Sequence, residues 1–245
     1  MILSVAILVG YWLALTVVPV PGENVLGLQS SSEPGRTLSA WFDRVTLDWS
    51  RWGMGTHIWA STRVYDPEGL FSTIPAIGTA LIGVLAGRWL GSARSLDDRL
   101  NGLLVAGALL VVAGLAWGLF FPINKNLWTS SFVLFTAGAG CVTLATIAWL
   151  VDVRQWTAWT EPLVVFGVNP IAAYVGSELL AMLFHSTIKF RIDGRLISLH
   201  QFVYYRVLPS WRGPSAAALA YSLGFVFLCY VILRAMYRRG IIVKI

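Results

Sequence analysis

Residues 100–121 read LNGLLVAGALLVVAGLAWGLFF, a stretch without a charged side chain. About 20 apolar residues in a helix are enough to cross the roughly 30 Å hydrocarbon core of a bilayer. Similar blocks recur along the chain and predict an all-α polytopic membrane protein with about six transmembrane helices. The predicted spans are Ile2–Val18, Leu70–Leu90, Leu100–Phe121, Leu127–Val151, Pro162–Phe184 and Ser215–Tyr237.

The composition excludes an ordinary soluble domain. Of the 245 residues, 57% are hydrophobic and 12% are charged, against about 45–50% and about 25% in soluble globular domains. The net charge of +6 comes from 18 Lys and Arg against 12 Asp and Glu. The basic residues lie in loops and at the C-terminus rather than in one patch, which argues against nucleic acid as a partner. Cysteine and histidine show no metal-ligand spacing, so we expect no metal site.

Basic residues in the short loops predict the orientation in the membrane. Arg88, Arg94 and Arg99 flank one short loop, and Arg154 lies in another. Under the positive-inside rule these loops and the basic C-terminus face the cytoplasm, so both chain termini are predicted to be cytoplasmic. The outer side carries more basic residues in total, but most of its sequence is in long segments that the rule weights less. These outer segments are residues 19–69, 122–126 and 185–214.

Small residues recur at four-residue spacing in the second and third predicted spans. In lipid, such rows let helix backbones approach closely, so we expect them at helix–helix contacts. The rows contain Thr79, Gly83, Gly87, Gly102, Ala106, Gly114 and Gly118.

The last outer segment has a pattern of its own. Polar and apolar residues alternate over Lys189–Ile192 and lead into Asp193-Gly194, a pair that favours a two-residue hairpin turn. Ser198 followed by Gln201 matches a capping box at the start of a helix. We expect a small hairpin and an interfacial amphipathic helix at the membrane surface.

Polar residues at the predicted start of the second span form the first candidate site. In Tyr65-Asp66-Pro67-Glu68-Gly69-Leu70, Asp66 suits the N-cap and Pro67 the first helical position, with Glu68 in the first turn. The same two carboxylates, at the mouth of a helix bundle, could bind a cationic or polyhydroxylated substrate or orient a catalytic base. Both interpretations can hold together.

A tight turn between the third and fourth spans forms the second candidate site. In Pro122-Ile123-Asn124-Lys125-Asn126-Leu127-Trp128, the structural interpretation is that Asn126 caps the next helix and Lys125 is solvated. The functional interpretation is that two amides, an ammonium and the Trp128 indole bind a polar ligand or stabilise developing negative charge.

Asn169-Pro170, inside the fifth predicted span, is the third candidate. Proline frees a backbone carbonyl in a spanning helix, and the neighbouring asparagine can satisfy or use the resulting kink. In a continuous helix Glu178 would point about 180° away from Asn169. The histidines His57, His185 and His200 are scattered through outer loops and are interpreted as surface residues.

The first two motifs, in this order and at this spacing, resemble the heparan-α-glucosaminide N-acetyltransferase family. The likeness extends over most of the chain. It includes Asp43-Arg44, His57-Ile58-Trp59, Val151-Asp152-Val153, Trp156, Gly167 to Asn169, Tyr174 to Glu178 and Lys244-Ile245.

The resemblance implies a multi-helix membrane bundle that transfers acetyl from cytoplasmic acetyl-CoA to the amino group of a glucosamine-type sugar on the periplasmic side of a bacterial inner membrane. It implies the lipid bilayer and an amino-sugar or glycan substrate as partners, and allows a homo-oligomer. Under it, Asp66 and Glu68 would recognise the sugar amine, with His57 in a supporting role. The acetyl oxyanion or the CoA would be bound by Asn124, Lys125, Asn126 and Trp128, and Asn169 would line the CoA passage.

One family motif is missing. The catalytic histidine of the family lies in a His-Ala-x-Trp type segment that does not occur in this sequence. We therefore expect residues 1–245 to be a single transmembrane acyltransferase-type domain that corresponds to the C-terminal portion of the family. The alternatives are a non-catalytic scaffold or transporter-like remnant, and an envelope-glycan O-acyltransferase.

Overall fold

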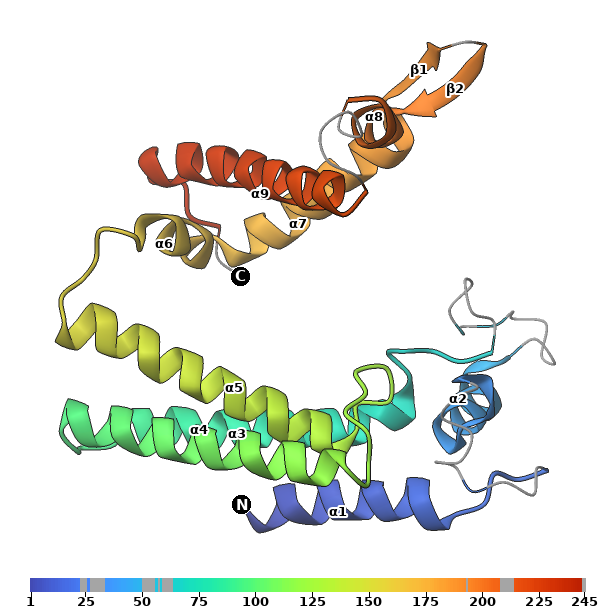
Figure 1. Cartoon of the computed structure of the whole chain (residues 1–245), viewed down its shortest axis with the longest axis vertical. Helices are drawn as coiled ribbons and strands as arrows, with labels where there is room; N and C mark the ends of the chain where they lie inside the picture. Colours follow the sequence, from blue (N-terminus) through green and yellow to red (C-terminus); the bar gives the residue numbers. More distant parts are fainter. Residues whose placement is uncertain are drawn as a thin grey trace. The chain divides into compact units, whose positions relative to one another are not determined.

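The computed structural model describes residues 1–22, 26, 34–49, 56, 58, 64–192, 194–207 and 214–243. The chain forms two compact units, Met1–Gln155 and Trp156–Ile245, each with its own packing. Both units are built of helices, with one short hairpin in the second unit (Figure 1). The expectation that residues 1–245 form a single domain is not tested by this division and stays a prediction.

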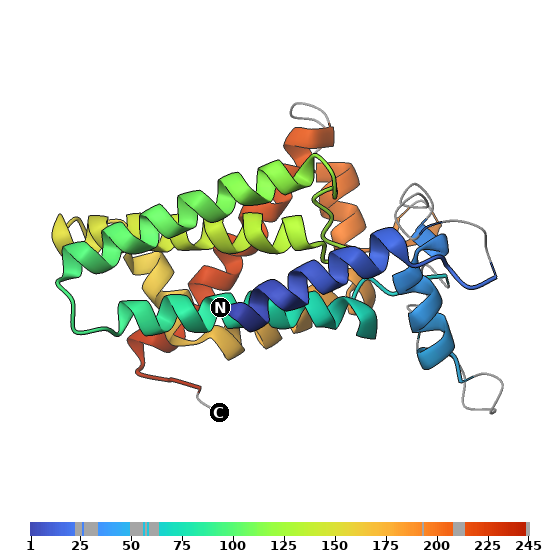
Figure 2. The ribbon, with the colours of Figure 1, turned by 90° about the horizontal axis from the view of Figure 1, so that it is seen from below.

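The first unit is a set of long helices with one shorter helix among them. They are α1 (Ile2–Val17), α2 (Leu38–Leu47), α3 (Leu70–Leu90), α4 (Leu96–Gly118) and α5 (Ser130–Ala148), with a 3-10 turn at Pro34–Arg36 and a π-helical turn at Trp149–Val153. α4 packs along α5, and α1 and α5 both pack against α3 (Figure 2).

The backbones of α4 and α5 approach each other closely at glycines. A Cβ atom on Gly138 would lie 2.6 Å from the carbonyl oxygen of Gly107, and one on Gly114 would lie 2.6 Å from the backbone nitrogen of Phe135. The prediction of a small-residue contact is confirmed for Gly114 and for Gly102, where a Cβ would lie 2.4 Å from the Trp89 side chain of α3, whereas Gly107 and Gly138 were not predicted. It is wrong for Gly83 and Gly87, around which a Cβ would meet nothing within 4 Å.

The predicted membrane helices are present, and the all-α polytopic fold class is confirmed. Among the described residues, helices long and apolar enough to cross a bilayer are Leu70–Leu90, Leu96–Gly118, Ser130–Val153 and Ser215–Arg238. A bent pair of helices would make a further span, and α1 is apolar but shorter, with 16 residues. At about 1.5 Å per residue α1 extends about 24 Å, somewhat less than the hydrocarbon core.

Two predicted helix starts are wrong. The third span begins at Leu96 rather than Leu100, because the Ser95 hydroxyl accepts a hydrogen bond from Asp98 N at 3.2 Å and acidic residues suit the positive end of a helix. The fourth begins at Ser130 rather than Leu127, because the preceding residues form a hydrogen-bonded turn. Apolarity locates the middle of a helix better than its end.

The second unit contains the broken span, the hairpin and the last long helix. Its elements are α6 (Glu161–Val168), α7 (Pro170–Met182), the π-helical turn η4 (Leu183–Thr187), β1 (Lys189–Ile192), β2 (Arg195–Ser198), α8 (Leu199–Phe202), the π-helical turn η5 (Val203–Val207) and α9 (Pro214–Arg238). The hairpin is confirmed as an antiparallel pair, and so is the capping box of Ser198 and Gln201. The expected amphipathic helix is α8, which is four residues long and continues into η5.

The fifth predicted span is broken at Asn169. α6 and α7 meet there at an angle of 88°. Pro170 begins α7 and has no N–H to continue the hydrogen bonding of α6, and Asn169 leaves helical geometry with φ −127° and ψ 56°. The argument that Glu178 faces away from Asn169 assumed a continuous helix and does not apply across this break.

The C-terminal tail is held at the break by the Asn169 side chain. Asn169 is fully buried. Its Nδ2 donates to the carbonyl oxygen of Ile241 at 3.0 Å, and its Oδ1 accepts from the backbone nitrogen of Val243 at 2.8 Å. The start of α6 is also joined to α9, because Arg234 Nε lies 2.8 Å from Glu161 Oε1.

We expect Asn169→Ala to free the tail and to lower the unfolding free energy by about 1–2 kcal/mol, because two hydrogen bonds at a buried side chain are lost. The measurements are the thermal midpoint in detergent and the rate of proteolytic removal of the tail. Asn101→Ala, at an exposed position of α4, is the control. An unchanged midpoint and an unchanged cleavage rate would contradict this role of Asn169.

Candidate functional site

The two sequence motifs of the first unit meet at Tyr11, a buried residue of the apolar helix α1. The Tyr11 hydroxyl donates to the carbonyl oxygen of Leu127 at 2.5 Å. The Tyr11 ring lies 5.4 Å from that of Phe71, in the first turn of α3. The start of α3 and the turn between α4 and α5 therefore lie at the same end of the unit, as the predicted topology required.

The first turn of α3 is capped by Asp43, a residue of α2. Asp43 Oδ1 accepts from the backbone nitrogen of Phe71 at 3.1 Å, and the Asp43 side chain is fully buried. Helix starts leave N–H groups without partners, and α3 has Gly69 at its N-cap position with no capping side chain of its own. An acceptor from elsewhere in the chain takes this role.

The prediction that Asp66 is the N-cap of this helix is wrong. Asp66 lies in a turn before the helix, where its Oδ1 accepts from Glu68 N at 2.9 Å and its carbonyl oxygen accepts from Gly69 N at 3.3 Å. Pro67 and Glu68 occupy the turn itself, so the helix begins three residues later than a local cap would place it. The Asp66 side chain is half-buried and that of Glu68 is exposed.

Gly69 is needed because Asp43 lies directly against its backbone. A Cβ atom at residue 69 would be 1.9 Å from Asp43 Oδ2 and 2.4 Å from Asp43 Cγ. Any side chain at this position would displace the carboxyl group. The glycine of the Asp-Pro-Glu-Gly motif is thus explained by a close approach between α2 and α3.

The electrostatics at this end of the unit disfavour further negative charge. Burial raises the pKa of the Asp43 carboxyl above its ordinary value, the hydrogen bond from Phe71 lowers it, and the negative charge of Asp66 raises it again. Asp43 Oδ2 has no hydrogen-bond partner among the described residues, although the Ser39 hydroxyl lies beside the carboxyl group. With Glu68 nearby in sequence, the region is suited to a cation.

The turn between α4 and α5 is built around Asn124. Its Oδ1 accepts from Asn126 N at 2.9 Å and from Leu127 N at 3.3 Å. Asn126 does not cap α5, as the structural interpretation had it; the N-cap residue is Thr129. Lys125 and Asn126 have exposed side chains and are available to a ligand.

Trp128 and the hydroxyl residues that follow it fasten this turn to neighbouring helices. Trp128 has a positive φ of 49°, and its Nε1 donates to Thr79 Oγ1 of α3 at 3.1 Å. The Thr129 hydroxyl donates to the carbonyl oxygen of Pro122 at 2.9 Å. Ser130 Oγ donates to the carbonyl oxygen of Leu8 in α1 at 2.6 Å.

Sequence reasoning missed Tyr11, Thr129 and Ser130 as parts of this site. The available signal was a tyrosine inside an apolar helix and a run of small hydroxyl residues just after Trp128, since buried polar groups in such helices need partners. The candidate residue His57 lies outside the described residues. Asn169 belongs to the second unit, whereas the other described candidates belong to the first. Among the described residues, three or more metal-ligating side chains do not gather anywhere.

Two of the histidines thought to be scattered are in contact. The rings of His185 in η4 and His200 in α8 stack with centroids 4.1 Å apart. His200 also lies 5.6 Å from the Tyr204 ring and 5.0 Å from the Tyr221 ring of α9. Burial lowers the pKa of His200, and the neighbouring His185 lowers it further.

The fold defines a multi-pass membrane protein, and the first unit gathers polar side chains at one end of its helices. Two curated proteins match the chain. Heparan-alpha-glucosaminide N-acetyltransferase of Homo sapiens is 32% identical over 199 residues, which cover 72% of this chain, and its counterpart in Mus musculus is 31% identical over 201 residues, which cover 73%. No protein-family model matches the chain.

These matches confirm the resemblance that the motifs predicted: the chain is related to the heparan-α-glucosaminide N-acetyltransferases. It spans 29% and 30% of the length of the human and mouse relatives. This partial coverage agrees with the prediction that the chain corresponds to one portion of the family's proteins.

We expect Gly69→Ala to lower the unfolding free energy by about 1–3 kcal/mol, because the new methyl group overlaps the Asp43 carboxyl. Gly83→Ala is the matched control in the same helix, since its Cβ would meet nothing within 4 Å. Helix propensity should leave that variant unchanged or up to about 1 kcal/mol more stable. Thermal midpoints in detergent measure both effects, and equal midpoints would refute the close approach.

We expect acid to loosen α8. Because the folded state lowers the pKa of His200, the neutral imidazole stabilises the packing against His185, Tyr204 and Tyr221. That stabilisation is complete above the ordinary histidine pKa of about 6.5 and is lost as the pH falls through the lowered value. Hydrogen exchange of residues 199–207, corrected for its intrinsic pH dependence, should rise in acid. In His200→Phe, which keeps a ring but cannot be protonated, a similar rise would contradict this cause.

Proposed function

We propose that this chain takes part in acetyl transfer from cytoplasmic acetyl-CoA to the amino group of a glucosamine-type sugar on the periplasmic side of a bacterial inner membrane, with both termini cytoplasmic. The observation that carries the proposal is the meeting of the two family motifs at Tyr11, because it brings acidic and cationic groups to one end of a membrane helix bundle. The names of the relatives support the same chemistry. The bilayer and the amino sugar are the partners in this proposal, and a homo-oligomer is compatible with it.

The reaction sets clear requirements on the site. The sugar ammonium must lose a proton before its nitrogen attacks the thioester carbonyl carbon. As the new C–N bond forms, the carbonyl oxygen gains negative charge, and the C–S bond then breaks to release CoA as a thiolate that takes up a proton. The site therefore needs carboxylates for the ammonium and donors for the oxyanion.

The residues of the first unit supply both kinds of group. Asp66 and Glu68 attract and orient the ammonium, as carboxylates at the mouth of the bundle. Lys125 and Asn126 provide exposed donors for the acetyl oxygen or for the CoA end. Asn124 and Trp128 stabilise the conformation of the turn that carries Lys125 and Asn126.

Two further residues have supporting roles in this proposal. His57 assists proton transfer in the long outer segment. Asn169 holds the break in the fifth span, through which the pantetheine arm of CoA would pass. Both of its amide atoms bind the tail, so its part is to keep the break in place rather than to bind CoA itself.

The test uses the purified chain in lipid nanodiscs with labelled acetyl-CoA and glucosamine, and measures N-acetylglucosamine by mass spectrometry. We expect Glu68→Gln to raise the KM for glucosamine, with about a tenfold loss in kcat/KM, because an exposed carboxylate partner of the ammonium is removed. Lys125→Ala should lower kcat or weaken CoA binding. Asp97→Asn, an exposed acidic residue in the first turn of α4, is the control.

The acceptor distinguishes this function from its alternatives. Transfer to hydroxyl groups of an envelope glycan, with none to the amine, would indicate an O-acyltransferase instead. Absence of transfer and of CoA binding by the purified chain would refute the proposal and favour a non-catalytic scaffold.

A further inference from the structure

The hairpin of β1 and β2 carries three exposed cations that have no partner in the described part of the chain. They are Lys189, Arg191 and Arg195. The hydrogen bonds and ion pairs of the described residues include none from these three side chains. In the sequence of residues 185–213 further basic residues follow at 206 and 212, and the acidic residue is Asp193. The segment is therefore strongly positive.

The strand register separates the hairpin into two different faces. Lys189 pairs with Ser198 and Arg191 with Leu196, so these residues share one face. Phe190, on the opposite face, lies 6.0 Å from the Phe202 ring of α8 and so packs toward the body of the unit. On the face with Lys189 and Arg191 these two side chains are exposed, as is Leu196 at 61%, while Ser198 is buried. Arg195 pairs with Ile192, so it lies on the Phe190 face, where its side chain is also exposed.

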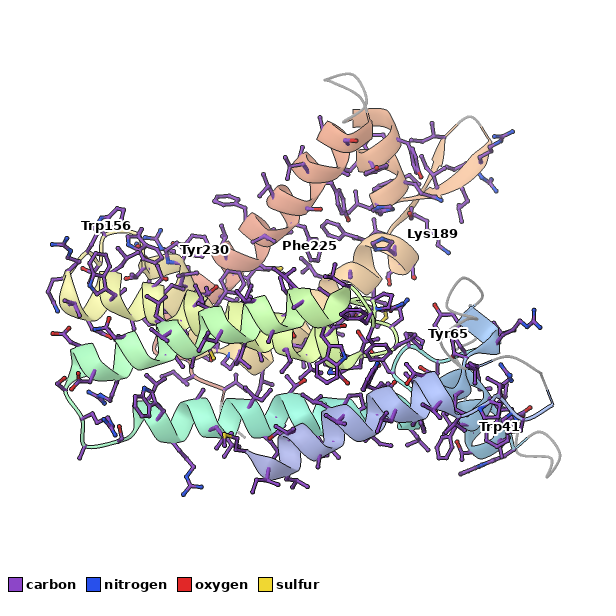
Figure 3. The ribbon with its side chains drawn as sticks, turned by 60° about the horizontal axis from the view of Figure 1, so that its bottom comes forward. Trp41, Tyr65, Trp156, Lys189, Phe225 and Tyr230 are labelled. Atoms are coloured by element: carbon purple, nitrogen blue, oxygen red, sulfur yellow. The ribbon has the colours of Figure 1, made fainter. Side chains whose placement is uncertain are left out.

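Chain connectivity places the start of the hairpin at the membrane boundary. The π-helical turn η4 continues the apolar helix α7 and ends at Thr187, and β1 begins one residue further on, at Lys189 (Figure 3). Four extended residues reach about 13 Å, and the headgroup layer on each side of a bilayer is about 5–8 Å thick. Because the hairpin starts where the apolar helix ends, its first residues lie in the headgroup layer, and its reach is long enough to cross that layer.

We propose that the exposed face of the hairpin docks on anionic phospholipid headgroups. Lys189 and Arg191 pair with lipid phosphates, and Leu196, on the same face, inserts between the acyl chains beside them. Arg195, on the other face beside the turn, adds to the positive charge that attracts the anionic surface. The charge of the segment and its continuity with a membrane helix select lipid over a soluble anion. Positive side chains near an anionic membrane surface each contribute about fivefold to binding, and salt weakens that attraction.

The test is hydrogen exchange of residues 188–198 in the full chain, in nanodiscs of phosphatidylcholine alone and of phosphatidylcholine with phosphatidylglycerol. We expect the anionic lipid to slow exchange of the hairpin amides by at least fivefold. The difference should vanish in the triple variant Lys189→Gln, Arg191→Gln, Arg195→Gln. It should remain in the charge-preserving variant Lys189→Arg, Arg191→Lys, Arg195→Lys, which controls for damage to the hairpin.

Other outcomes would overturn the proposal. They are equal exchange in the two lipid mixtures, an effect that persists in the neutral variant, and an effect that is lost equally in both variants. Slowing by a soluble sulfated or uronate glycan but not by anionic lipid would assign the face to a carbohydrate instead. Acetyl transfer is not needed for any of these measurements.

Discussion

The first unit depends on the Asp43 carboxyl group that lies against the backbone of Gly69. The carboxyl accepts a hydrogen bond from the free N–H of Phe71 in the first turn of α3 and lies against that helix from α2. This contact is costly, because it buries a carboxyl with one oxygen unpartnered. The buried carboxyl lies at the end of the helix bundle where the two motifs meet. Asp66 and Glu68, which we propose as substrate-binding residues, precede the same helix start.

In the apolar part of the unit, hydroxyl side chains also bond to the backbone of other segments. Tyr11, Thr129 and Ser130 each donate to a backbone carbonyl, either in the turn between α4 and α5 or on a neighbouring helix. In lipid, apolar surface alone gives little preference for one helix arrangement over another, so packing and hydrogen bonds decide it. The glycines of α4 and α5 provide the packing, and these hydroxyls fix where α1 and the turn lie.

In the second unit, an asparagine side chain and stacked rings hold the tail and α8 to the apolar helices. Asn169 binds the tail with both amide atoms at the point where the proline has removed helix hydrogen bonds. The stacked His185 and His200 join the end of the broken span to α8. Polar and aromatic side chains thus hold the tail and α8 to the apolar helices of this unit.

The sequence by itself determined that this is a multi-pass helical membrane protein with a short hairpin. Hydropathy and local turn chemistry depend only on residues close in the chain, so the Ser198 capping box and the hairpin ladder were predictable. The sequence also located the two motifs. Only the tertiary structure decided that Asp43 caps α3 in place of Asp66, that Tyr11 joins the motifs and that His185 and His200 stack. It also decided that α4 and α5 approach each other at Gly107, Gly114 and Gly138. Each of these depends on which residues far apart in the chain become neighbours, and a periodic pattern of apolar residues carries no information on that choice.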